Sequence, residues 1–253
     1  MKKKFLLLFL STFFLLSCKN TSHLALSRIE GEELNVSDSI PANDSIQDFI
    51  KPYKQHIDEE MNAVLAYSAY DLKKSDGDLN SALGNMMADA VMQLSNPVFK
   101  KRTGNSIDIV LLNYGGIRSS VKEGDITTRT AYQLMPFENE VIVAKLNGQQ
   151  VREMVRYLID AGVAHPVSGI QLDLGADNSL QQVLIQGEPL DIKKDYFVAT
   201  NDYLFQGGDN MTFFAGAKEV TSLDYKIRNI LIDYFTAEDT IAPVQDQRFT
   251  RKQ

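Results

Sequence analysis

The stretch IDIVLLNYGGIRSS, residues 107–120, joins an apolar run to a polar turn with two glycines. The run IDIVLLN predicts a β-strand, because it is rich in β-branched and aliphatic residues. Asn113, Gly115 and Gly116 then place an amide side chain and flexible backbone at the edge of a sheet, where loops commonly build binding sites. Arg118 carries a planar guanidinium suited to bidentate contact with phosphate or carboxylate. A glycine turn with an arginine in a surface ion pair would give the same pattern, so this stretch alone leaves both interpretations open.

Helix-like and strand-like segments mix along the rest of the chain. Apolar residues recur at helical spacing in three segments, so we expect helices near residues 83–94, 151–159 and 227–235. Because the segments show no regular strand-helix-strand alternation, the sequence predicts an α+β fold, a single domain with a mixed β-sheet packed by helices. The remaining strand-like runs are EVIVAKL from residue 140, GIQLDL from residue 169, LQQVLIQG from residue 180 and YFVATND from residue 196.

A further packing helix is expected to begin in the stretch NDSIQDFIKPY, residues 43–53. Ser45 or Asp44 would cap this helix, and Pro52 would kink or restart it. Apolar residues continue at helical spacing as far as Val64.

The first seventeen residues differ from the rest of the chain. Three lysines at residues 2–4 precede an apolar run at residues 5–16, which is followed by Ser17 and Cys18. This order is typical of a secretory signal peptide, and the run is too short to span a membrane as a mature helix. The LLS before the cysteine resembles the lipobox of bacterial lipoproteins, so we expect cleavage after residue 17 and lipidation of Cys18. An ordinary cleaved signal that happens to contain a cysteine is the alternative.

Residues 18–43 are polar and weakly patterned, so we expect a lipidated cysteine and a flexible tether ahead of a domain at residues 44–253. Cys18 is the only cysteine, which excludes an intramolecular disulfide. Cleavage would remove three lysines and no acids and change the formal charge from −7 to −10. This acidity argues against a nucleic-acid partner. No run of acids follows Cys18, and we expect an exported bacterial lipoprotein, anchored to a membrane by its lipid and facing the periplasm.

Two further stretches have the composition of binding loops: LMPFENE at residues 134–140 and TNDYLFQGGDNMTF at residues 200–213. Together with the first stretch they supply what a nucleotide site requires. Phe137 and Tyr203 can stack on a base, at about 1–3 kcal/mol per base. An amide can read the base edge, Asp209 can hold ribose hydroxyls, and an arginine can meet phosphate. Taken singly, both aromatics are more often core residues, and GGD is more often only a turn.

The motifs LGNMMADA, NYGGIR, MPFENE, LNGQQV, VSG and NDYLFQGGDNMTF occur in the order found in one family. The chain resembles the C-terminal, substrate-binding domain of the 5'-nucleotidases, the group that includes UDP-sugar hydrolase and 2',3'-cyclic nucleotide phosphodiesterase. The resemblance extends from about Pro52 to the C-terminus. It implies these roles: Asn113 contacts the base edge, Arg118 binds phosphate, Phe137 and Tyr203 stack on the base, Asp209 binds ribose, and Gly207 and Gly208 leave room beside the sugar.

Two positions depart from that family. Tyr203 stands where the family usually has a phenylalanine or a similar aromatic residue, and a tyrosine can still stack. Ahead of LGN, where family members often carry a further phosphate-binding arginine, this chain reads KKSDGDLNSALGN. Lys73 or Lys74 would substitute there only as a mobile point charge, which puts tight phosphate binding in doubt.

The resemblance also implies where hydrolysis takes place. Family members with full activity have an N-terminal metallophosphatase domain, whose two metal ions are held by Asp, His and Asn ligands and activate the attacking water. This chain has three histidines, His23, His56 and His165, and none lies in such a ligand pattern. We therefore expect no catalytic residue and no cofactor in this chain, with divalent metals only in a partner.

Two functions remain in view. In the first, the chain is the nucleotide- or nucleoside-binding half of a split 5'-nucleotidase that acts in nucleotide catabolism together with a separately encoded metallophosphatase. Alternatively, it is a stand-alone nucleoside- or nucleotide-binding lipoprotein without hydrolase activity. The retained Arg118 favours the first, because a pure nucleoside binder would not need it.

Overall fold

The structure is a computed structural model of the 253-residue chain and describes residues 26, 28–37 and 39–252. The predicted signal peptide and Cys18 lie outside the described residues. The chain divides into two parts, Met1–Phe49 and Ile50–Gln253. In the first part, the described residues before Asp44 form no helix or strand. Within the described ranges, no helix combines the length and the apolar character needed to cross a membrane.

Helix α2 (Asp44–Met61) differs from the sequence-based expectation at both ends. Its first amides are capped by Asn43, whose Oδ1 accepts hydrogen bonds from the backbone amides of Ser45 and Ile46, at 3.1 and 3.3 Å. The expected caps, Ser45 and Asp44, were wrong because both lie inside the first turn. At the other end the apolar spacing misled: the helix ends at Met61, and Val64 begins strand β1 (Val64–Ser68). Pro52 lies inside α2 without ending it.

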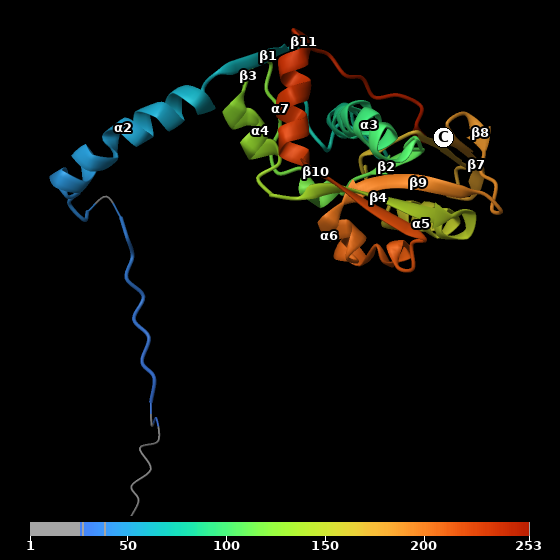
Figure 1. Cartoon of the computed structure of the whole chain (residues 1–253), viewed down its shortest axis with the longest axis horizontal. Coiled ribbons are helices and arrows are strands. Elements are labelled where there is room, and N and C mark those ends of the chain that lie inside the picture. The colour runs from blue at the N-terminus through green and yellow to red at the C-terminus, as the bar shows by residue number, and fades with distance from the viewer. Residues whose placement is uncertain (1–25, 27, 38, 253) are drawn as a thin grey trace, which may run out of the picture. The chain divides into compact units, whose positions relative to one another are not determined.

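Beyond α2 the chain forms one domain with three mixed sheets (Figure 1). The helices are α3 (Ala82–Thr103), α4 (Thr128–Leu134), α5 (Gly148–Ala161), α6 (Asp202–Phe205) and α7 (Ile227–Ala237), and the 3-10 turns are η1 (Tyr114–Gly116), η2 (Gly208–Asn210) and η3 (Thr212–Phe214). The strands after β1 are β2 (Ile109–Leu111), β3 (Gly124–Thr127), β4 (Glu140–Asn147), β5 (Val167–Ser168), β6 (Ile170–Leu174), β7 (Leu180–Ile185), β8 (Glu188–Pro189), β9 (Asp195–Asn201), β10 (Glu219–Lys226), β11 (Thr240–Ile241) and β12 (Phe249–Arg251).

The central sheet has five strands in the order β10-β4-β9-β2-β5. Strands β2 and β9 are parallel, and the other pairs are antiparallel. The two smaller sheets have the orders β11-β1-β3 and β12-β6-β7-β8, and each combines one parallel pair with antiparallel pairs. The fold is therefore α+β with mixed strand directions, as the sequence predicted, but the strands divide among three sheets.

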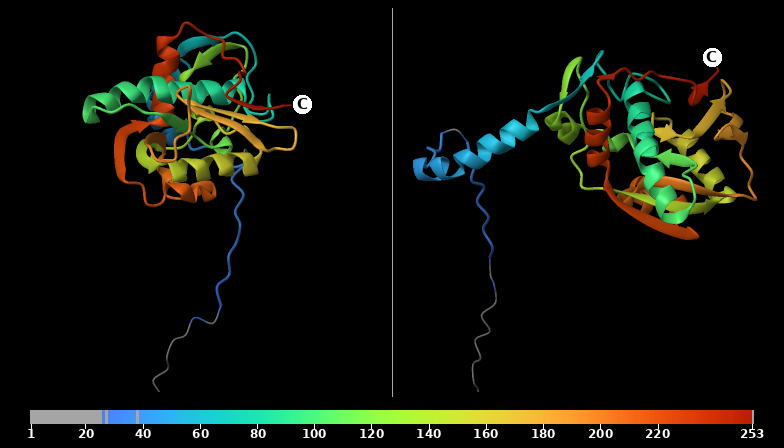
Figure 2. Two further views of the ribbon diagram at one scale, coloured as in Figure 1. Left: turned by 90° about the vertical axis from the view of Figure 1, so that its right-hand side faces the viewer. Right: turned by 45° about the horizontal axis from the view of Figure 1, so that its top comes forward.

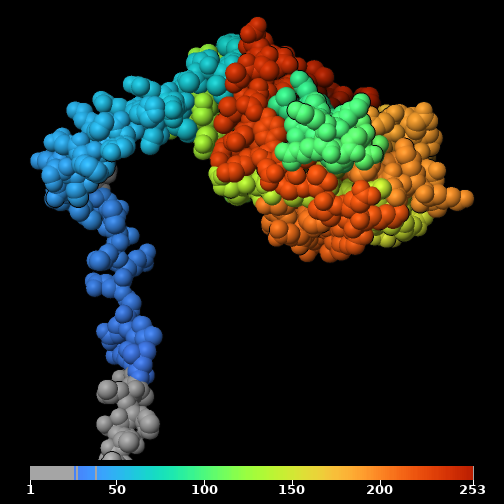
Figure 3. Space-filling model, viewed as in Figure 1, coloured from blue at the N-terminus to red at the C-terminus, as the bar shows by residue number. Residues whose placement is uncertain are grey.

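Both faces of the central sheet are covered, with α3 and α7 on one side and α5 on the other (Figures 1 and 2). In β2, Val110 packs with the α3–α7 cluster, while Ile109 and Leu111 pack with the α5 cluster. Successive side chains of a strand point to opposite faces, so a strand covered on both faces is apolar throughout. This explains the unbroken apolar run before Asn113. On the outer surface α3 and α7 lie side by side (Figure 3).

The three later helices and the five strand-like runs expected from the sequence are present, with ends shifted by a few residues. The other seven strands, and helices α4 and α6, were not expected. Among these strands, β1, β3 and β10 are largely exposed or half-buried, and exposed strands carry a weaker apolar pattern.

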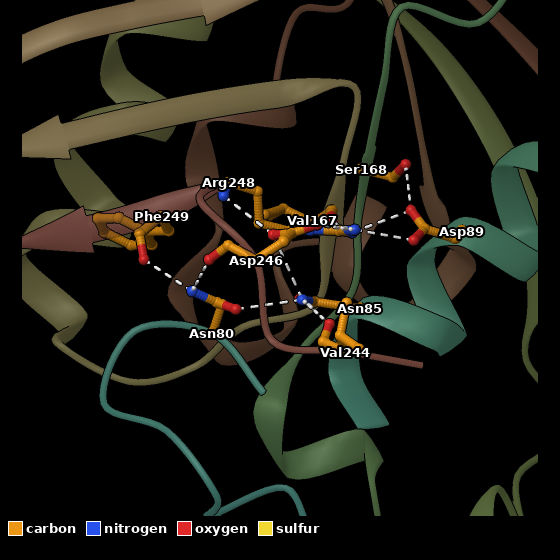
Figure 4. A network of polar contacts seen from close by, with 9 residues as sticks. All are labelled: Asn80, Asn85, Asp89, Val167, Ser168, Val244, Asp246, Arg248 and Phe249. Atoms are coloured by element: carbon orange, nitrogen blue, oxygen red, sulfur yellow. Dashed lines mark hydrogen bonds and ion pairs between the residues drawn. The ribbon is translucent and has the colours of Figure 1, made fainter. Parts of the chain in front are cut away.

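A polar network joins the segment before β12 to α3 (Figure 4). We call its members, Asn80, Asn85, Asp89, Asp246 and Arg248, the C-terminal clasp. Arg248 binds Asp89 in a bidentate pair, with its two terminal nitrogens 2.9 and 2.8 Å from the carboxylate oxygens. The same guanidinium bonds both oxygens of Asp246. Asn80 and Asn85 donate to backbone carbonyls of residues 249 and 244, at 2.8 and 3.1 Å.

Candidate functional site

Three loops meet at one edge of the central sheet. Because β2 and β9 are parallel neighbours, the segments that follow them leave the sheet at the same edge. Strand β4 runs antiparallel to β9, and its Val141 pairs with Asn201, so the loop before β4 reaches that edge too. The sheet topology therefore brings together the three stretches that the sequence singled out.

These loops enclose a cavity of about 450 Å³. Seven of the nine candidate site residues line it: Asn113, Gly115, Gly116, Arg118, Phe137, Tyr203 and Asp209. Met135, Asn139 and Asn201 also line it and were not singled out from the sequence, although each lies within a quoted stretch. Gly207 and Gly208 do not line the cavity and belong to the turn that leads to Asp209.

Other hollows are as large or larger, including one of about 570 Å³ along α5 and one of about 650 Å³ beside β12. Neither combines two exposed aromatic rings with an amide, a carboxylate and an arginine. Convergent polar groups in an aromatic-lined hollow are the features expected of a small-molecule site, so we take the cavity of three loops as the candidate site.

Asp209 lies at the centre of the polar groups. Its Oδ2 accepts a hydrogen bond from Asn113 Nδ2 at 2.6 Å, and its Oδ1 accepts one from the Tyr203 hydroxyl at 2.9 Å. Asp209 has φ 51°, in the left-handed region that an aspartate tolerates better than most residues. The backbone carbonyl of Asp209 accepts a further bond from the Tyr157 hydroxyl, at 2.9 Å. Two side chains therefore hold the carboxylate of Asp209, and a third holds its backbone.

Two glycines make this arrangement sterically feasible. A Cβ on Gly116 would lie 2.7 Å from Asn113 Oδ1, and a Cβ on Gly208 would lie 2.5 Å from Cε1 of Tyr203. The space at Gly208, which we expected beside a sugar, is thus filled by the tyrosine ring. Half of each cavity aromatic stays accessible: Phe137 is 40% exposed and Tyr203 is 47% exposed.

Arg118 lies at the rim with much of its hydrogen-bonding capacity unused. In the part of the chain that the structure describes, its guanidinium makes a single hydrogen bond, at 3.3 Å, to the carbonyl of Gly115, and the guanidinium carbon lies 5.9 Å from the centre of the Phe137 ring. Lys74 lies nearby: its ammonium donates to the carbonyl of Ile117 at 2.8 Å and lies 4.4 Å from the centre of the Tyr114 ring. Burial, and then the charge of Arg118, lower the pKa of Lys74.

The loop that carries Phe137 is held from behind by α7. Arg228 at the start of α7 has a side chain that is 6% exposed, donates to the Phe137 carbonyl at 3.4 Å and forms an ion pair with Glu138. Lys226 binds the same carboxylate. The guanidinium of Arg228 lies 4.1 Å from the centre of the Tyr132 ring. Hydrogen bonds from Arg228 and then Lys226 lower the pKa of Glu138 to about 2. Nothing in the sequence pattern pointed to Arg228 as a partner of this loop, because it lies 90 residues after Glu138 in the chain.

The two aromatic loops are also joined to each other. Asn139, next to the Phe137 loop, donates to Asp202 Oδ1 at 2.7 Å. The backbone amide of Tyr203 donates to the same oxygen at 2.9 Å. Asp202 thus connects the loop that contains Phe137 to the residue Tyr203.

His165 supports the floor of the site. It is 5% exposed, and its Nδ1 accepts a hydrogen bond from the Tyr114 amide at 3.1 Å. Burial lowers the pKa of His165 and keeps the imidazole neutral. Among the residues that the structure describes, no three His, Cys, Asp or Glu side chains form a group that could hold a metal ion.

The fold and the cavity together define an α+β domain with a cavity lined by aromatic and polar side chains. Residues 56–216 match the family "5'-nucleotidase, C-terminal domain", and the chain belongs to that family. It is similar to the 5'-nucleotidase of Vibrio cholerae, with 25% identity in an alignment of 230 positions that covers 87% of this chain and 38% of that protein.

Two solved structures share the fold. The 5'-nucleotidase precursor from Thermus thermophilus superposes with a TM-score of 0.68 and 23% identity, over 85% of this chain and 44% of that one. The NAD nucleotidase of Haemophilus influenzae gives a TM-score of 0.63 and 18% identity, over 83% of this chain and 42% of that one. This chain therefore spans less than half the length of these similar proteins.

Proposed function

We propose that this domain is the nucleotide- or nucleoside-binding half of a split 5'-nucleotidase and positions nucleotides for phosphoester hydrolysis by a separately encoded metallophosphatase. One observation carries the proposal: the sheet topology gathers two half-exposed aromatic rings, a buried amide, a carboxylate and a nearly unpaired arginine around one cavity. Family membership supports the nucleotide class of ligand.

Each group has a role that suits its geometry. The rings of Phe137 and Tyr203 supply stacking surfaces for the base. Asn113, whose residue is 8% exposed, offers its amide to the base edge while it is held by Asp209. Asp209 accepts hydrogen bonds from the sugar hydroxyls. Arg118, with most of its donors unused, extends toward the phosphate.

The assignment of hydrolysis to a partner rests on the sequence. Cleavage of the phosphoester in this family needs metal-activated water, and the three histidines of this chain lack the metal-ligand patterns of a dinuclear site. In the proposal, the partner contributes both metal ions and the attacking water, while this chain contributes the affinity for the nucleoside.

A stand-alone binding protein is the second candidate, and one observation favours it. The carboxylate of Asp209 is already held by two side chains of this chain, Asn113 and Tyr203. Polar groups that are held in place before a ligand arrives suit binding of a nucleoside without a partner.

We further propose that the protein is an exported lipoprotein anchored through Cys18 and facing the periplasm. The three lysines, the apolar run and the LLSC stretch support this location. Labelling of the wild type, but not of a Cys18→Ser variant, with radioactive palmitate would test it. Absence of label in the wild type would contradict it.

Calorimetric titration of the full chain in detergent with adenosine and AMP tests the binding site. We expect saturable binding that weakens about tenfold or more in Phe137→Ala and in Tyr203→Ala, because each variant removes one stacking surface. Tyr67 of β1 is similarly exposed, at 44%, but lies outside the cavity, and Tyr67→Ala is the matched control. Unchanged affinity in both cavity variants would contradict the proposed site.

Hydrolysis distinguishes the two candidates. For the split enzyme, AMP hydrolysis should require both this chain and an exported metallophosphatase from the same organism, and Phe137→Ala should raise the KM of the pair. If this chain binds AMP but no such metallophosphatase gains activity from it, the stand-alone candidate is favoured instead.

A further inference from the structure

Both oxygens of the Asp209 carboxylate are occupied by donors from this chain. Asn113 Nδ2 bonds Oδ2 at 2.6 Å, and the Tyr203 hydroxyl bonds Oδ1 at 2.9 Å. The hydroxyl also accepts a longer bond, at 3.3 Å, from the Asp209 amide. The group proposed to receive the sugar is therefore already hydrogen-bonded before any ligand arrives.

Contacts on two sides hold the Tyr203 residue in this position. The ring lies directly against Gly208, where an added Cβ would come within 2.6 Å of Cζ as well as 2.5 Å of Cε1. Its backbone amide is fixed by Asp202. The hydrogen bond to Asp209 also raises the pKa of the Tyr203 phenol, so the hydroxyl keeps its proton and acts as the donor.

The hydrogen bond from Tyr203 to Asp209 reduces the binding free energy that is lost when a ligand lacks a sugar hydroxyl. When a ligand covers a carboxylate that has no other partner, an analogue without the hydroxyl leaves a buried acceptor unsatisfied, and such sites discriminate strongly. A carboxylate oxygen has two lone pairs, so one that already accepts from Tyr203 can take a ribose hydroxyl and still remains satisfied without one.

We propose that Tyr203 determines the sugar specificity of this site: its hydroxyl satisfies Asp209 and lets the site accept ribose and deoxyribose nucleotides alike. The inference rests on the proposed function, in which the sugar lies against Asp209. It concerns a single hydroxyl group, which a phenylalanine at this position would lack.

The test is calorimetric titration of the full chain in detergent with adenosine, 2'-deoxyadenosine and 3'-deoxyadenosine. In the wild type we expect the dissociation constants of the deoxynucleosides to lie within about threefold of that of adenosine. In Tyr203→Phe, Asp209 Oδ1 loses its donor while the stacking ring remains, and we expect adenosine to be preferred over at least one deoxynucleoside by about tenfold or more.

Tyr157→Phe is the matched control. It removes a hydroxyl that bonds the backbone carbonyl of the same aspartate at 2.9 Å and leaves both carboxylate donors in place. The ratio between adenosine and the deoxynucleosides should stay as in the wild type, even if overall affinity changes.

The outcomes separate the inference from the proposed function. If the wild type binds adenosine more than about tenfold tighter than both deoxynucleosides, or if Tyr203→Phe leaves the ratio unchanged, the inference is wrong while nucleoside binding stands. If the wild type binds none of the three nucleosides, the proposed function fails and the inference fails with it.

Discussion

Two arginines of this protein lie in polar networks of similar composition and are used in opposite ways. Arg248 in the C-terminal clasp has a side chain that is 14% exposed and bonds two carboxylates and the carbonyl of Val167. Arg118 at the cavity is exposed, and its guanidinium makes one hydrogen bond within the described part of the chain, to the carbonyl of Gly115. Both networks also contain asparagine and aspartate side chains.

The two arginines differ in how many of their hydrogen-bond donors are already used within the protein. Burial works against the charge of Arg248, but its hydrogen bonds to Asp246 and Asp89 outweigh burial and raise its pKa. A guanidinium whose donors are all used has nothing left to offer a ligand, and its value lies in holding two chain segments together. A guanidinium with free donors beside a cavity contributes little to the fold and retains its capacity for an anion.

The largest expected effect comes from Arg248→Met. The variant leaves Asp89 and Asp246 without their shared partner, and we expect a loss of about 2–3 kcal/mol in the free energy of unfolding, moderated because both carboxylates are partly exposed. Urea denaturation measures this loss. Adenosine affinity below the unfolding transition should match the wild type. If the variant were as stable as the wild type within experimental error, Arg248 would contribute no more to the fold than Arg118 does.

For Arg118→Met we expect the opposite result, a change in ligand binding with little change in stability. We expect stability within about 0.5 kcal/mol of the wild type, because one long hydrogen bond is lost at an exposed site. The preference for AMP over adenosine should fall by about tenfold, since a charged hydrogen bond to the phosphate is removed. Titration with both ligands measures the preference. Arg152→Met, an exposed arginine on α5 outside the cavity, should retain it.

The smallest effect concerns the acid sensitivity of the Phe137 loop. Arg228 and Lys226 lower the pKa of Glu138 from its ordinary value of 4.5 to about 2. Because the folded state favours the charged carboxylate, the ion pairs stabilise the fold above pH 4.5, and this contribution is lost as the pH falls toward 2.

Glu138→Gln should therefore be slightly less stable than the wild type at pH 7, and the two should converge as the pH approaches 2. Urea midpoints recorded from pH 7 downward give the comparison. A difference that stays constant over that range would mean that the charge of Glu138 does not contribute through its two cationic partners.

Much of the candidate site could be predicted from the sequence, because the loops carry local signals. Paired glycines, an amide after an apolar strand and isolated aromatics among polar residues mark Asn113, Phe137 and Asp209 without knowledge of the fold. The strand runs were equally visible, since strands covered on both faces are apolar throughout. Lys74, one of the two lysines considered as a substitute for a phosphate-binding arginine, contacts the carbonyl of Ile117 and a neighbouring tyrosine ring, and its role in phosphate binding stays a prediction.

Interactions that depend on long sequence separations could not be predicted. Arg228 lies ninety residues beyond Glu138, and Arg248 lies 159 residues beyond Asp89. No local pattern distinguishes these arginines from exposed ones. The hydrogen bond from Tyr203 to Asp209 spans only six residues, but it depends on a left-handed turn at Gly207 that the letters GGD do not specify. The sequence-based expectation extended the helix before β1 as far as Val64, because apolar spacing does not reveal where a helix ends.

The clasp also has a consequence for the order of folding. Strand β12 pairs in parallel with β6, and the ion pair that secures it closes a separation of 159 residues. Contacts of such long range form late, since the entropy of closing the loop opposes them until the rest of the domain is in place. Until then β6 would be an open edge carrying the apolar residues Leu172 and Leu174, and open edges of this kind invite pairing between molecules. By securing β12 against β6, the clasp closes an edge of the sheet that would otherwise be open in the folded domain.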